Sequence, residues 1–385
     1  MLNVEPRPCG HNEAIADFRF DDKTYTITTS ANVPLRSSGT SWLAPATIAA
    51  MHGNHELYIH STVDDVARAG AAKAQRLMAS WWPETMHEVP VDATATPDVP
   101  ASHERGVGSF FSGGLDSFYT AVRHQPEITH LVFVHGFDIF LNNEEYYETT
   151  VDRLRKAAAE MGKTLIELRS NIRVLDKETG GWGKAHGAAM VHVAELLSEH
   201  VHTMYVPASD CDKNPAADGS HPDLVPHGSH PDLDPLWSSS RVRILQSGVD
   251  ATRVDKARMV KNSDAAMTHL RVCYWNRNDV RNCGECDKCV RTAINVYVAG
   301  AECAALPEID LVKALDRIPM NKTREVFVQE NLAGLREGPV NDARLESALE
   351  RALRRTWPQR AFARAWNSAV IAKVAALTIR EKLTR

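Results

Sequence analysis

The chain has 385 residues, of which 43% are hydrophobic and 24% are charged, and its net charge is −5. No run of about 18 apolar residues could cross a bilayer, so we expect no membrane-spanning segment and no membrane partner. The N-terminal residues lack the basic start and apolar core of a signal peptide, so we expect a cytoplasmic protein.

Residues 1–88 are expected to form a small α+β unit. An alternating segment with a two-aspartate turn at 18–31 predicts a hairpin, and helical apolar spacing predicts a helix over 62–82. Residues 89–106 are rich in proline and bury little, which is typical of a linker. No group of residues in this part of the chain indicates catalysis.

From residue 107 the pattern changes to alternating strands and helices, and we expect one domain over 107–305. The predicted strands are 107–111, 129–137, 163–170 and 202–209, and the predicted helices start at 115 or cover 143–162 and 185–201. This alternation predicts an α/β fold with a parallel, doubly wound sheet. Ligands of such sheets bind at the carboxyl ends of the strands, near a topological switch point.

Residues 306–385 are expected to form a helical C-terminal region. Residues 351–385 contain nine Lys or Arg residues and one acidic residue, on an otherwise acidic chain. A basic tail of this kind indicates either a nucleic-acid partner or a solvated basic helix face, and both interpretations stay open.

A long polar segment at 210–240 contains the hexapeptide GSHPDL twice, at 219–224 and 228–233. Two short copies are too few for a repeat architecture. A duplicated loop and a mobile active-site lid remain equally good interpretations.

The segment SGGLDS lies between a predicted strand and a predicted helix; its residues are Ser112, Gly113, Gly114, Leu115, Asp116 and Ser117. Glycines let the backbone approach a ligand, and the N-terminus of the following helix attracts anions. The two serines can donate further hydrogen bonds, and Asp116 would hold a Mg²⁺ ion that bridges phosphates. The Walker signature GxxxxGK[ST] is absent, which excludes a phosphate loop of the kinase or GTPase kind.

Four cysteines predict a metal site near the end of the same domain. Cys283, Cys286 and Cys289 have the spacing Cys-x2-Cys-x2-Cys, and Cys273 precedes them by ten positions. Four thiolates can enclose a tetrahedral Zn²⁺ ion, and Gly284 suits the tight turn between the first two. An iron–sulfur cluster is the alternative, since cysteines ligate it too.

SGGLDS in this context resembles the pyrophosphate loop of the PP-loop ATP pyrophosphatases. Together with the four cysteines, it makes residues 107–300 similar to the 7-cyano-7-deazaguanine synthases of the queuosine pathway. The resemblance implies a PP-loop, Rossmann-like domain with a zinc knuckle that uses ATP, Mg²⁺ and Zn²⁺. Weaker likenesses are YVPASDCD, DATRVDKARMV and Arg291 after the last cysteine. Residues 1–106 and the helical tail lie outside the compact core of that family, and the loop at 210–240 is longer, so we expect a changed acceptor.

The resemblance implies a ligase that adenylates a carboxylate or amide oxygen of a small, purine-like or other, acceptor. Pyrophosphate would leave, and ammonia would then displace AMP. Lys256, Arg253 and Lys184 are candidates for the cation that stabilises departing pyrophosphate. Sulfur transfer, with Cys211 as the reactive thiol, is the rival chemistry. An inert ATP-binding module is the alternative from another class.

These alternatives imply the partners of the chain. We expect a small-molecule substrate, and a second protein could supply the ammonia or the sulfur. A tRNA substrate would give the basic tail a purpose but is not favoured. The sequence leaves homo-oligomerisation open.

Overall fold

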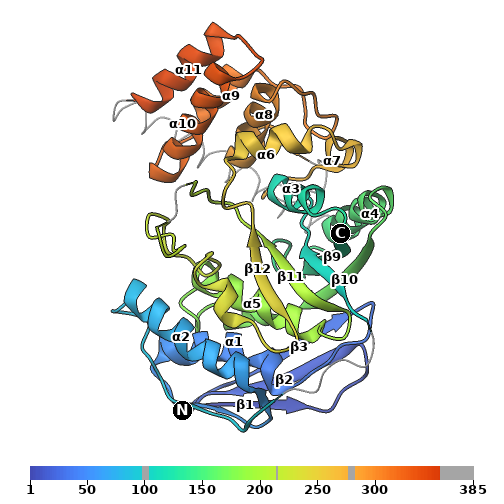
Figure 1. The fold of residues 1–385 in the computed structure, drawn as a ribbon, viewed down its shortest axis with the longest axis vertical. Coiled ribbons are helices and arrows are strands. Elements are labelled where there is room, and N and C mark those ends of the chain that lie inside the picture. The colour runs from blue at the N-terminus through green and yellow to red at the C-terminus, as the bar shows by residue number, and fades with distance from the viewer. Residues whose placement is uncertain (98–103, 214–215, 276–281, 356–385) are drawn as a thin grey trace, which may run out of the picture. The chain divides into compact units, whose positions relative to one another are not determined.

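The computed structural model of the chain describes residues 1–97, 104–213, 216–275 and 282–355 (Figure 1). The chain divides into two units, each made of several segments. The first unit comprises Met1–Phe111, His124–Tyr147 and Gly162–Val249, and the second comprises Ser112–Arg123, Glu148–Met161 and the chain from Asp250 onward. These boundaries do not coincide with the expected domains 1–88, 89–106, 107–305 and 306–385.

The first unit is built on one ten-stranded sheet, in the order β12-β11-β8-β9-β10-β3-β2-β1-β4-β6. Six of its nine strand pairs are parallel. The strands are β1 (Leu2–Arg7), β2 (Glu13–Arg19), β3 (Thr24–Ala31), β4 (Leu57–Ile59), β6 (Val91–Asp92), β8 (Gly106–Phe110), β9 (Ile128–His135), β10 (Thr164–Ser170), β11 (Val201–Pro207) and β12 (Arg243–Ser247). The expected α/β class with a mostly parallel central sheet is confirmed.

Five strands of residues 1–92, namely β1, β2, β3, β4 and β6, extend this sheet. β3 pairs antiparallel with β10, with Leu168 opposite Ala31. β2 then pairs antiparallel with β3, and β1 pairs antiparallel with β2. The predicted hairpin is therefore present as β2 and β3. Its place beside β10 depends on hydrogen bonds between residues more than 130 positions apart, which a local pattern does not encode.

The sheet has its topological switch point beside β8. The chain passes from β8 to β9 and β10 on one side, and then returns to β11 and β12 on the other. The connection that follows β8 and the connection that leads to β11 thus lie on opposite sides of β8. Open α/β sheets bind ligands at such a point, at the carboxyl ends of the strands. The segment SGGLDS follows β8 directly.

Three helices of the first unit pack against the sheet and enclose its core: α1 (Gly39–Gly53), α2 (Asp65–Trp81) and α5 (Trp182–Leu196). Helix α1 contacts both other helices and strands β1 and β4, and its first thirteen residues are buried. The sequence did not lead us to expect α1. Small elements complete the unit: a two-stranded sheet of β5 (Val63–Asp64) and β7 (Ala95–Thr96), and short 3₁₀ helices at Ile172–Leu175 and Asp234–Trp237.

Helices make up the described part of the second unit. They are α3 (Leu115–Arg123), the larger part of α4 (Glu144–Glu160), α6 (Arg253–Val260), α7 (Asp264–His269), α8 (Asp287–Val298), α9 (Leu311–Arg317), α10 (Lys322–Glu337) and α11 (Ala343–Leu353). Apolar side chains of α6 and α8–α11 form one core. The predicted helix that would carry most of the basic tail lies outside the described residues.

Among the described residues, none of the helices has the length and apolar character that a membrane crossing requires.

Candidate functional site

The glycine-rich loop lies between the end of β8 and the first turn of α3. Gly113 has a φ of +76°, and a Cβ atom there would lie 2.8 Å from Cδ2 of Leu154. The position therefore needs glycine for its backbone conformation and for space. The Gly113 carbonyl accepts a 2.7 Å hydrogen bond from the Arg271 amide, and the Ser112 carbonyl accepts one of 3.3 Å from the Arg271 guanidinium. These bonds fix the shape of the loop.

The start of α3 offers unused hydrogen-bond donors. The amides of Leu115, Asp116 and Ser117 have no acceptor among the described residues. The Ser117 hydroxyl donates to the Gly114 carbonyl over 3.0 Å, and the Gly114 amide donates to Oγ of Ser112 over 3.4 Å. Free amides at the N-terminus of a helix, backed by its dipole, attract anions. The loop thus has the donor arrangement that a phosphate group would use.

The carboxylate of Asp116 binds two buried cations. Arg253 Nη1 lies 2.5 Å from Oδ2, and Lys256 Nζ lies 3.2 Å from Oδ1. The side chain of Arg253 is 5% exposed and that of Lys256 is fully buried. Burial alone would raise the pKa of Asp116, but the charges of Arg253 and Lys256 outweigh it and lower that pKa. Asp116 is therefore ionised and neutralises part of a cationic centre.

Helix α6 places both cations on one side of α3. Thr252 caps the helix by accepting from the Asp255 amide, and Asp255 accepts in return from the Thr252 amide, so the first turn is fixed. Glu330 of α10 accepts a 3.3 Å hydrogen bond from the amide of Arg253, and burial raises the pKa of this carboxyl group. Glu330 was not among the residues that the sequence suggested, because it lies 77 positions from Arg253 and in no recognisable motif.

Two other predicted residues lie in the first unit. Lys184 donates a 2.6 Å hydrogen bond to Oγ1 of Thr85, and its ammonium group lies 5.2 Å from the ring centre of Trp82. Cys211 follows β11, is partly buried and forms no disulfide with a described residue. Of the three candidate cations, Arg253 and Lys256 are thus the two that contact the loop residue Asp116.

The four cysteines form a tight cluster in the second unit. The Sγ atoms of Cys273, Cys283, Cys286 and Cys289 all lie within 4.8 Å of one another. Cys283 and Cys289 are 3.8 Å apart, close to the spacing of roughly 3.8 Å that two thiolates 2.3 Å from one tetrahedral zinc would have. In a multi-iron cluster, thiolates that bind different irons lie farther apart than this. The cluster could hold a single metal ion such as zinc.

The backbone around the cysteines supports this geometry. Amides of Glu285 and Cys286 donate to Sγ of Cys283 over 3.4 and 3.2 Å. Gly284 has a φ of +68°, and a Cβ atom there would approach Pro307 to 2.9 Å, so the predicted glycine turn is present. Hydrogen bonds among the thiols lower the pKa of Cys273 and raise that of Cys289. Only a bound cation would let all four be thiolates together.

Asn282 links the chain segments on either side of this cluster, and it was not among the residues that the sequence suggested. Its buried amide oxygen accepts from the amides of Val272 and Cys273, and its nitrogen donates to the carbonyls of Leu270 and Ala305. Its position next to Cys283 was the one available hint.

The two GSHPDL copies are joined to each other in the first unit. Asp232 of the second copy accepts from both the backbone amide and Nδ1 of His221 in the first, each over 2.9 Å. His227, between the copies, lies 3.0 Å from the carboxylate of Asp210. The interpretation as a lid is not tested by these contacts.

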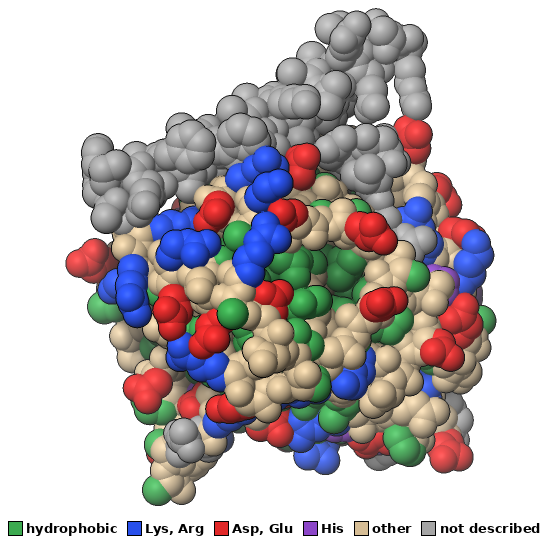
Figure 2. All heavy atoms as spheres, turned by 90° about the horizontal axis from the view of Figure 1, so that it is seen from above, with side chains coloured by type: hydrophobic (Ala, Val, Ile, Leu, Met, Phe, Trp, Pro, Cys, Tyr) green, Lys and Arg blue, Asp and Glu red, His purple; other side chains and the backbone are tan. Residues whose placement is uncertain are grey.

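On the face drawn in Figure 2, Lys and Arg side chains are interspersed with Asp and Glu side chains. That face has no broad basic patch among the described residues, and a tRNA partner stays an expectation.

Comparison with known proteins returned no matching family model, no matching curated protein and no matching solved structure.

Proposed function

We propose that this chain is an ATP-dependent ligase that adenylates a carboxylate or amide oxygen of a small acceptor and passes the activated group to ammonia. One observation carries the proposal: the loop SGGLDS opens α3 at the switch point of a parallel sheet, and its Asp116 is bound to Arg253 and Lys256. A loop of free amides beside buried cations suits a triphosphate that must lose pyrophosphate.

The reaction has two balanced steps. An acceptor oxygen attacks the α-phosphorus of ATP; the new O–P bond forms while the bond to the β-phosphate oxygen breaks, and pyrophosphate leaves with the electron pair. Ammonia then attacks the activated carbon, AMP leaves with the bonding pair, and the nitrogen loses a proton to water. The role of the chain is to stabilise the charge of pyrophosphate with the loop amides, Arg253 and Lys256.

Each oxygen of Asp116 contacts one cationic side chain and keeps a second acceptor position, so these contacts neither provide nor exclude a metal ligand. The ligation of Mg²⁺ by Asp116 therefore remains an expectation from the sequence.

The test is pyrophosphate release from ATP, measured over a panel of carboxylates, purine-like heterocycles and tRNA. Acceptor-dependent release of pyrophosphate and AMP in equal amounts supports the proposal. Tight ATP binding without turnover on any acceptor would instead favour the ATP-binding module. Release that requires sulfide and yields a sulfur-containing product would favour sulfur transfer.

A further inference from the structure

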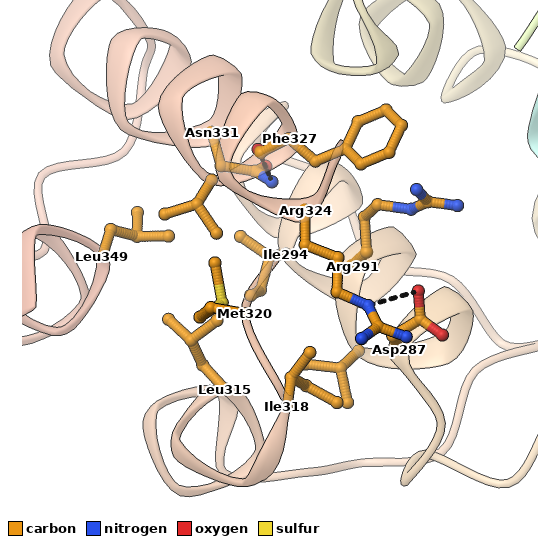
Figure 3. A pocket seen from close by; sticks show the side chains of 12 residues that line it. Asp287, Arg291, Ile294, Leu315, Ile318, Met320, Arg324, Phe327, Asn331 and Leu349 are labelled. Carbon is orange, nitrogen blue, oxygen red and sulfur yellow. Dashed lines mark hydrogen bonds and ion pairs between the residues drawn. The ribbon is translucent and has the colours of Figure 1, made fainter. Parts of the chain in front are cut away.

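A small cavity of about 30 Å³ lies among helices α8, α9, α10 and α11 of the second unit. Figure 3 shows apolar side chains gathered on one side of it and charged side chains on the other. The apolar side is formed chiefly by Ile294, Leu315, Ile318, Met320 and Leu349. A space of this size takes a small apolar group of a few carbon atoms.

The two arginines at the charged side differ in their partners. Nε of Arg324 lies 3.5 Å from the carboxylate of Asp287 (Figure 3). Arg291 has no hydrogen bond or ion pair with any described residue, and its Nε is buried. Its guanidinium lies 4.0 Å from the ring centre of Phe327. A half-buried guanidinium without a hydrogen-bonded anion is costly, so an anionic ligand group is the expected complement.

Arg291 also belongs to the electrostatic environment of the loop. The guanidinium of Arg253 repels that of Arg291, whereas the carboxylates of Asp287 and Asp116 attract it. Nε of Arg253, itself 5% exposed, likewise has no partner among the described residues. Figure 3 shows the stem of Arg291 beside the cavity and its guanidinium pointing away from Met320 and Leu315. A ligand with an apolar end and an anionic end would match this arrangement.

We propose that this cavity binds a short-chain aliphatic carboxylic acid, with its hydrocarbon end among α8–α11 and its carboxylate on Arg291. The binding itself does not depend on the ATP chemistry. The further identification of this acid as the acceptor rests on the proposed function, because its carboxylate would then be the group that is adenylated.

The test uses the full chain without a tag and without ATP, in isothermal titration calorimetry. The probes are 3-methylbutanoate, its uncharged amide, the polar acid hydroxyacetate and inorganic phosphate. We expect 3-methylbutanoate to bind at least about tenfold more tightly than each of the other three, because only it supplies both the charge and the apolar group. Phosphate that binds as tightly would identify Arg291 as a general oxyanion site and overturn the proposal.

Variants connect the binding to these residues. Arg291→Gln should weaken 3-methylbutanoate by at least about tenfold, because the carboxylate loses its charged partner. The matched control Arg336→Gln, whose exposed guanidinium pairs with Glu346 and Glu350 outside the cavity, should stay within about threefold. Ile294→Phe should fill the cavity and also abolish binding; if it does not fold, Arg291→Gln alone decides. Absence of binding, or binding that Arg291→Gln leaves unchanged, refutes the site.

Pyrophosphate exchange into ATP separates this inference from the proposed function. An acid that binds through Arg291 but supports no exchange would refute the proposed function and leave the binding site standing. Exchange with a 7-deazapurine carboxylic acid, without binding of the aliphatic acid, would refute the aliphatic acceptor and leave the ligase standing.

Discussion

At the scale of single residues, the structure changes what Asp116 is expected to do for stability. The sequence presents it as a residue of the glycine-rich loop that would hold a Mg²⁺ ion. In the fold, its carboxylate is the counter-ion of Arg253 and of the fully buried Lys256. Removing one member of a buried ion cluster leaves the others uncompensated.

Asp116→Asn is therefore expected to lower the free energy of unfolding by about 3–5 kcal/mol, in addition to any loss of activity. The control is Asp250→Asn, which breaks the exposed ion pair with Arg123 and should cost about 1 kcal/mol or less. Urea unfolding of both variants measures the difference. Equal effects would mean that Asp116 does not neutralise a buried centre.

A second residue-scale prediction concerns pH. His192 is fully buried, and its Nε2 and Nδ1 lie 3.0 Å from the Thr29 hydroxyl and 2.8 Å from the Ser41 carbonyl. Burial lowers its pKa from 6.5 to about 4. Between pH 6.5 and 4, this histidine is therefore protonated in the unfolded chain but neutral in the folded chain. The free energy of unfolding falls by about 3 kcal/mol as the pH decreases from 6.5 to 4.

His192→Gln should reduce this loss between pH 7 and pH 4, whatever its effect at pH 7. The exposed His202 provides the control His202→Gln, which should keep the wild-type pH dependence. Denaturant unfolding at several pH values gives the slope. A slope that His192→Gln leaves unaltered would assign the acid sensitivity to other groups.

At the scale of elements, the turn from β8 into α3 depends on the space around Gly113. Gly113→Ala introduces both a strained positive φ and a contact of 2.8 Å with Leu154. The control is Gly162→Ala: Gly162 has a similar φ of +66°, but a Cβ atom there would have no atom within 4 Å. This variant therefore measures the cost of the positive φ alone, about 1–2 kcal/mol. We expect Gly113→Ala to be the more destabilising in thermal unfolding and to reduce ATP turnover. Equal destabilisation would show that the loop can shift freely.

The cysteine cluster and the start of α8 form a second element that can be tested. We expect about one zinc per chain by elemental analysis, and a large loss of zinc in Cys289→Ser. Cys303→Ser is the matched control, because Cys303 lies outside the cluster and its thiol donates to the Met267 carbonyl. A brown protein with iron and labile sulfide would contradict the zinc assignment.

At the scale of the whole molecule, the choice between nitrogen and sulfur chemistry rests on Cys211. Under the proposed function, Cys211→Ser keeps most of its turnover with ammonium as the donor. In a sulfur transferase the thiol would carry a persulfide, and multiple turnover would be lost while pyrophosphate release survived. Product analysis by mass spectrometry decides. A sulfur-containing product that disappears in Cys211→Ser would reverse the assignment.

The order of elements from residue 107 was predictable because each strand and helix leaves its own local periodicity. The strands 107–111 and 163–170 were found within one residue as β8 and β10, and α4 within two residues at either end. Helix α1 was missed: its first thirteen residues are all buried, so no amphipathic pattern marks it. The pairing of β3 with β10 was missed because strand partners are chosen by long-range hydrogen bonds and shared burial.

The sequence by itself determined the local chemistry: the glycine loop, the cysteine spacing and the alternation of strands and helices. The glycine loop, the cysteine spacing and each single strand or helix are encoded in fewer than about twenty consecutive residues. Backbone preferences and periodicity act over that length. Only the tertiary structure decided that Asp116 neutralises Arg253 and Lys256, that Glu330 contacts α6 and that Arg291 has no hydrogen bond or ion pair with a described residue. These facts depend on which distant side chains share a low-dielectric interior. In such an interior the attraction within an ion pair is strong, and an unpaired charge is destabilising.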